Sequence, residues 1–146
     1  MINPFDLRTA LLAKHAQHVV LIHFPIALFL IGVGFDVAGL RAKTSARRTA
    51  LTSAATLNIA TATFFVLPAV LTGVAAWQWQ LEGQKLKGLL RLHLILGCVS
   101  ASLICLVGWA RKQSPRLYIP LEMLTALIVG LTAHVGGFLS GVNIPG

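Results

Sequence analysis

The sequence predicts an all-α fold, a four-helix transmembrane bundle, and three observations lead to this prediction. Hydrophobic residues make up 56% of the 146-residue chain and charged residues only 11%, whereas charged residues form about a quarter of an ordinary soluble domain. The mean hydropathy is +0.80. The apolar residues fall into four runs, each close to the roughly 20 residues that a helix needs to cross hydrocarbon.

The four predicted spans follow one another with short connections. They cover residues 18–40, 49–77, 92–110 and 118–140. Pro25 and Pro68 fall inside the first two spans, but membrane helices tolerate proline. Short connections favour antiparallel neighbours, so we expect an up-down-up-down bundle. The expected organisation is an N-terminal interfacial segment (1–17), a single transmembrane domain (18–140) and a C-terminal tail (141–146).

Loop charge predicts how the bundle is oriented. The connections after the first and third spans carry more basic residues than the opposite face, and cytoplasmic loops are enriched in lysine and arginine. We therefore expect both termini on the external side of a multi-pass protein of the bacterial inner membrane. The net charge of +8 fits contact with the lipid bilayer. No aromatic-basic surface or recognised motif accompanies this charge, so no nucleic-acid partner is expected.

Four of the five histidines are expected to lie at one depth in the membrane. His18 and His23 open the first span, His93 opens the third, and His134 lies near the end of the fourth. Alternating spans would bring all four to the same external side. Ionisable groups inside hydrocarbon are costly and usually functional. The four imidazoles therefore predict a haem or metal site.

Haem b, in one or two copies, is the expected cofactor. Imidazoles from two helices can approach haem iron from opposite faces while the porphyrin fills the gap between helices. Arg91 could pair with a propionate, and Gly97, Gly136 and Gly137 could make room for the ring. Which histidines pair is left open. Non-haem iron or copper is the alternative, because three or four imidazoles also suit these ions.

Two acidic residues, Asp36 and Glu122, fall near the span ends away from the histidines. One interpretation pairs them with arginines that extend toward the membrane surface, namely Arg41, Arg48 or Arg116. The alternative is a role in proton uptake. Either interpretation places these carboxyl groups on the cytoplasmic side.

The second span carries polar residues that are expected to bond between helices. Thr52, Thr56 and Thr63 lie along one stripe of a helix. Asn58 lies off that stripe, and we expect it to make an interhelical bond as well. Such polar bonds are a common way for membrane helices to associate.

Several short motifs are shared with a family of bacterial membrane proteins. They are His18, the His-Phe-Pro-Ile element at 23–26, Asp36, Leu-Thr-Gly at 71–73 followed by Trp77, His93, and His-Val-Gly-Gly at 134–137. In these motifs the chain resembles domain-of-unknown-function family 2231 over roughly residues 18–139. Val19 and Gln78 stand where members often have proline and aspartate. The resemblance implies a four-helix membrane domain and leaves its chemistry open.

Three functional hypotheses follow from these observations. The first is a small b-type cytochrome or cytochrome subunit with bis-histidine haem ligation, which transfers electrons on the periplasmic side. Its partners would be a quinone, or membrane or periplasmic redox subunits of a larger respiratory or photosynthetic complex. The second is a non-enzymatic membrane anchor or assembly subunit, and the third is a metal-ion binding or transport protein. No hydrolytic or group-transfer constellation is present, so electron transfer is expected rather than stand-alone catalysis.

Overall fold

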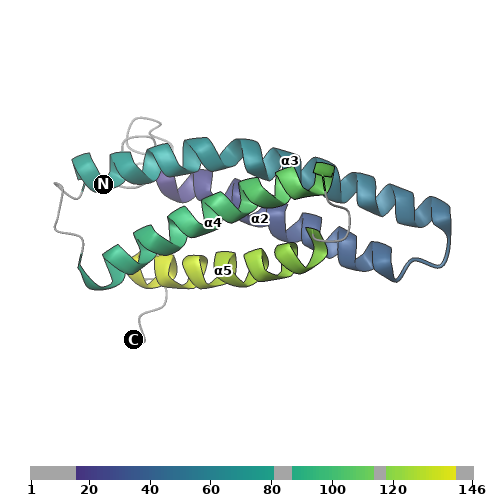
Figure 1. The fold of residues 1–146 in the computed structure, drawn as a ribbon. Helices are drawn as coiled ribbons and strands as arrows, with labels where there is room; N and C mark the ends of the chain where they lie inside the picture. The colour runs from purple at the N-terminus through teal and green to yellow at the C-terminus, as the bar shows by residue number, and fades with distance from the viewer. Residues whose placement is uncertain (1–15, 81–86, 114–117, 141–146) are drawn as a thin grey trace, which may run out of the picture.

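The computed structural model describes residues 16–80, 87–113 and 118–140, and within these ranges all regular structure is helical (Figure 1). The elements are α2 (Ala16–Leu40), α3 (Ser45–Ala75), the π-helical turn η1 (Ala76–Gln80), α4 (Gly88–Gln113) and α5 (Tyr118–Leu139). All four α-helices are long and apolar enough to cross a membrane. The predicted all-α fold is therefore confirmed. Residues 1–15 of the expected interfacial segment and the tail 141–146 lie outside the described residues.

The second and third helices extend beyond the spans that hydropathy predicts. α3 begins before residue 49 because Thr44 caps it, and the Thr44 hydroxyl accepts a hydrogen bond from the Arg47 backbone N–H at 3.3 Å. α4 continues past residue 110 through Arg111 and Lys112. Arginine and lysine end an apolar run, but they are good helix formers. The helices therefore continue through charged residues that lie outside the predicted spans.

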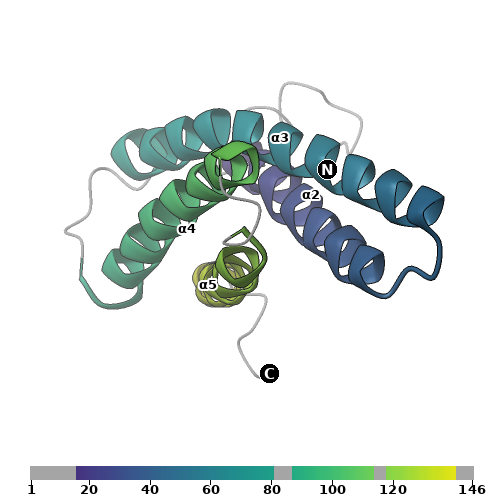
Figure 2. The same cartoon turned by 45° about the vertical axis from the view of Figure 1, so that its right-hand side comes forward.

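Consecutive helices pack against each other in opposite directions. In the first pair, His18 of α2 meets Thr72 near the end of α3, while Gly39 near the end of α2 lies against Thr52. α4 and α5 form the second antiparallel pair, α3 packs on α4, and α2 packs on α5. In Figures 1 and 2, α3 and α5 lie on opposite sides of the bundle with α2 and α4 between them.

Side chains from all four helices form a narrow apolar core. Its buried members are Phe29, Val33, Ile59, Ala62, Ile104, Val107 and Val129. Many other large apolar side chains, such as Leu57 and Phe64, are exposed on the outer faces. These outer faces suit hydrocarbon, where close van der Waals packing between helices provides much of the stabilisation.

Gly32 allows α2 to approach α3 closely. A Cβ at Gly32 would lie 2.7 Å from Cγ1 of the buried Ile59, whereas a Cβ at Gly34 would meet nothing within 4 Å. We expect Gly32→Val to lower the free energy of unfolding by about 1–3 kcal/mol through overpacking. Gly34→Val is the matched control, with the same helix and the same change in side chain. Equal losses for both variants in detergent unfolding would contradict this close approach.

Candidate functional site

The candidate functional residues lie at two opposite ends of the bundle. At one end, where α2 and α4 begin and α3 and α5 finish, are four histidines: His18, His23, His93 and His134. At the other end, where α2 and α4 finish and α5 begins, Asp36, Arg111 and Glu122 form a charged cluster. The predicted separation of the histidines from the acidic residues is thus present in the fold.

Two of the histidines face inward against glycines of the neighbouring helix. A Cβ at Gly73 would lie 2.9 Å from Cε1 of His18, and a Cβ at Gly136 would lie 3.0 Å from Cε1 of His93. Each imidazole occupies space that only a glycine leaves open. Gly136, predicted to make room for a porphyrin, makes room for His93 in this structure. A Cβ at Gly97 would meet nothing within 4 Å, so the space beside that residue is open.

The two inward-facing imidazoles differ in their polar contacts with the helix that they pack against. Nδ1 of His18 lies 3.4 Å from the hydroxyl of Thr72. His93 packs on Gly136 of α5, and its Nδ1 is buried without a hydrogen-bond partner. These contacts join α2 to α3 and α4 to α5. His18 and His93 therefore have a clear packing role.

The other two histidines, His23 and His134, are exposed. Nδ1 of His23 lies 2.5 Å from the carbonyl oxygen of Val19, one turn earlier in α2. A carbonyl can only accept, so Nδ1 of His23 is the donor, and in the neutral imidazole the lone pair is then on Nε2. The ring of His134 meets Phe138 edge to face, with centroids 5.0 Å apart. The fold thus divides the predicted ligands into an inward pair and an exposed pair.

The histidines share one end of the bundle without forming a multi-ligand metal cluster. Among residues 16–80, 87–113 and 118–140, no group of three or more His, Cys, Asp or Glu side chains is placed to hold a metal ion. A haem needs only two imidazoles, so the donor chemistry stays compatible with haem. Arg91 is exposed near the start of α4, and its contact with a propionate stays a prediction.

Arg111 connects all four helices at the opposite end. Its Nη1 donates to Oδ2 of Asp36 on α2 and, at 2.5 Å, to Oε1 of Glu122 on α5. Its Nη2 donates to the hydroxyl of Thr56 on α3 at 2.9 Å. The Tyr118 ring centroid lies 4.7 Å from the guanidinium carbon, within the range of a cation–π contact. Asp36 and Glu122 are only 3% and 1% exposed.

The predicted pairing of the two carboxyl groups with Arg41 or Arg48 was wrong. Asp36 and Glu122 both pair with Arg111, while Arg41 and Arg48 are exposed and Arg116 lies outside the described residues. Arg111 falls just after the predicted third span (92–110), because the apolar run ends before it. However, it continues the inward-facing stripe of Ile104 and Val107 at helical spacing. That spacing could have identified Arg111 from the sequence.

The predicted polar bonds of α3 are only partly present. Thr56 makes the expected interhelical hydrogen bond, to Arg111. Thr63 packs against Gly108 of α4, where a Cβ would lie 3.0 Å from its hydroxyl oxygen. For Asn58 the prediction was wrong, because its side-chain amide donates to the carbonyl of Ala54 in its own helix at 2.9 Å. That local bond uses one of the two N–H donors of the Asn58 amide within α3.

A protein-family model described as "Predicted membrane protein (DUF2231)" matches residues 14–142. The chain belongs to this family. The match covers all four long helices, so the resemblance predicted from the histidine motifs is confirmed, and the protein is a multi-pass membrane protein. Neither the curated proteins nor the solved structures give a match to the chain. The description of DUF2231 names no reaction.

Proposed function

We propose that this protein is a small b-type cytochrome, or a cytochrome subunit, of the bacterial inner membrane, with His23 and His134 as the axial ligands of one haem. The proposal rests mainly on the exposure of the His23 ring and on the hydrogen bond that its Nδ1 makes. This ring is exposed at the histidine end, and Nδ1 is held 2.5 Å from the Val19 carbonyl. Metal-ligating histidines characteristically donate their other ring N–H in this way, which orients the ring and increases its basicity.

The second proposed ligand, His134, comes from a helix that packs beside α2. It is the other exposed imidazole at this end of the bundle, and α2 and α5 are in contact. His18 and His93 are less suited to ligation because their rings already pack against Gly73 and Gly136. A haem bound by two histidines would supply reversible one-electron chemistry.

The remaining residues at this end would support binding rather than ligate. The glycine contacts of His18 and His93 fix the starts of α2 and α4 against α3 and α5. Arg91 offers an exposed cation that suits a propionate. The apolar faces of the four helices exclude water from the bundle. Electrons would then be exchanged at the periplasmic surface with a quinone or a redox subunit.

An absorption spectrum of the detergent-purified protein tests this proposal. After expression with added haem precursor, we expect a Soret band, a sharp α band of b type on dithionite reduction, and a matching pyridine haemochrome. A protein that stays colourless under these conditions would contradict the proposal of a bound haem. Elemental analysis of the same sample would then report on iron or copper held without a porphyrin.

A second candidate function, a non-enzymatic membrane subunit, is favoured by the packing of His18 and His93. Both imidazoles fill glycine spaces between helices, a role that needs no cofactor. In this case the protein would bind neither haem nor metal, and its exposed apolar faces would pack against other subunits. The absorption spectrum and the elemental analysis distinguish this candidate from the cytochrome.

A further inference from the structure

The charged cluster around Arg111 has one more potential negative charge than positive charges. Every helix contributes to it: Asp36 from α2, Thr56 from α3, Arg111 from α4, and Glu122 and Tyr118 from α5. Thr56 and Tyr118 are neutral side chains, so only Arg111 balances the two acids. If both carboxyl groups were ionised, the buried cluster would carry one uncompensated negative charge. An uncompensated charge out of water is strongly unfavourable.

The arrangement of the two carboxyl groups indicates where a bound proton would neutralise this excess negative charge. Both bind the same guanidinium nitrogen, Nη1, which brings the two carboxyl groups close to each other. Oε2 of Glu122 is buried and has no hydrogen-bond partner. Two carboxylates at such close range cannot both ionise easily. A proton shared between Asp36 and Glu122 removes both the repulsion and the excess charge.

We propose that Asp36 and Glu122 form a proton-binding site that holds one exchangeable proton, with Arg111 as the fixed counter-charge. The site is separate from the histidines and does not depend on a bound haem. A metal cation does not suit this site, because the guanidinium of Arg111 already forms ion pairs with both carboxyl groups. The proton is the cation that fits the cluster without displacing Arg111.

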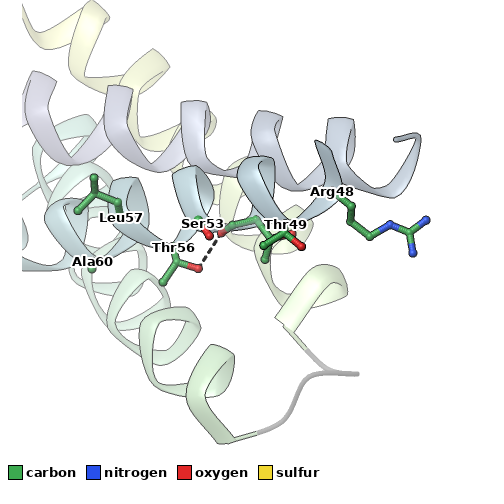
Figure 3. A pocket seen from close by; sticks show the side chains of 7 residues that line it. Arg48, Thr49, Ser53, Thr56, Leu57 and Ala60 are labelled. Carbon is green, nitrogen blue, oxygen red and sulfur yellow. Dashed lines mark hydrogen bonds between the residues drawn. The ribbon is translucent and has the colours of Figure 1, made fainter. Parts of the chain in front are cut away.

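An open surface pocket rich in hydroxyl groups lies along the first turns of α3 (Figure 3). Its lining residues are Arg48, Thr49, Thr52, Ser53, Thr56, Leu57 and Ala60. Thr56 is the lining residue that contacts the cluster: it donates to the Thr52 carbonyl at 2.8 Å and accepts from Arg111 at 2.9 Å. Hydroxyl groups can hydrogen-bond water within a membrane. These hydroxyl groups would offer protons a polar route from the start of α3 to the cluster.

Infrared spectroscopy of the full chain in lipid nanodiscs tests the proton site. At neutral pH we expect a carbonyl stretching band from a protonated carboxyl group that shifts when H₂O is replaced by D₂O. The chain has only four acidic side chains, which makes the assignment tractable. The band should disappear in Glu122→Gln or Asp36→Asn. It should persist in Glu82→Gln, the control for acidic residues elsewhere.

Two spectroscopic results would overturn the proton site. One is the absence of a protonated carboxyl band at neutral pH in the unaltered protein. The other is a band that survives both Glu122→Gln and Asp36→Asn, because it would then belong to another carboxyl group. Glutamine and asparagine keep the shape of the side chains, so these variants preserve the packing of the cluster.

The rate of deuterium exchange at the same band tests the pocket as the proton route. We expect Thr56→Val to slow the exchange several-fold, because it replaces the hydroxyl that contacts the cluster with a methyl group. Thr61→Val is the matched control, since Thr61 bonds within its own helix to Leu57 and does not line the pocket. Equal exchange rates in the two variants would exclude access through the pocket.

Discussion

Replacing Arg111 with alanine is expected to lower the free energy of unfolding by about 3–5 kcal/mol, the usual cost of removing one partner from a buried ion pair. Asp36 and Glu122 would remain buried with no cation beside them. The hydrogen bond to Thr56 and the contact with Tyr118 would be lost as well. Because Arg111 connects all four helices, the loss should appear as a lower temperature of cooperative unfolding in detergent or nanodiscs.

The adjacent Lys112→Ala is the matched control for Arg111→Ala. Lys112 is exposed on the same turn of α4, so its removal is expected to change the free energy of unfolding by only about 0.5 kcal/mol. Similar losses for the two variants would show that the charged cluster does not hold the bundle together.

Two further variants separate the charge of Arg111 from its shape. Arg111→Lys keeps the charge, but an ammonium group lacks the planar fork that binds two acids and a hydroxyl, so an intermediate loss is expected. Combining Arg111→Met with Asp36→Asn and Glu122→Gln should recover much of the stability, because no charge is then left buried. Failure of this triple variant to improve on Arg111→Ala would indicate a purely steric role for Arg111.

Substituting the exposed histidines is expected to abolish haem binding. His23→Ala and His134→Ala each remove one proposed axial ligand, so the α band and the bound haem should be lost from the purified protein. His18→Ala and His93→Ala should keep the spectrum of bound haem. They should instead lower the unfolding temperature, because each leaves a void beside Gly73 or Gly136. The measurements are the haem-to-protein ratio and thermal unfolding.

This histidine series also tests how the proposed ligands pair. If His18→Ala or His93→Ala removes the haem while His23→Ala and His134→Ala retain it, the inward pair ligates and the proposed assignment is wrong. Unfolding measurements on each variant distinguish loss of a ligand from loss of the fold. A His23→Ala protein that still unfolds cooperatively but carries no haem would be the strongest support for ligation by His23.

The four membrane helices and the family could be predicted from the sequence alone. Hydropathy acts over windows of about 20 residues and does not depend on which helices are neighbours. The spacing of His18, His23, His93 and His134 likewise placed the histidines at one end and the acidic residues at the other. Short motifs such as His-Phe-Pro-Ile at 23–26 identified the family, and the family match over residues 14–142 confirmed it.

Only the tertiary structure decided which side chains meet. When a helix is apolar on every side, hydropathy does not indicate which of its faces packs inward. The rotation of each helix about its axis therefore could not be predicted from the sequence. Rotation and close approach turned His18 and His93 toward glycines, left His23 and His134 exposed, and placed Arg111 between Asp36 and Glu122. Sequence determined which segments enter the membrane, because that depends on composition. Packing determined the polar contacts, because these depend on the relative rotation of helices distant in sequence.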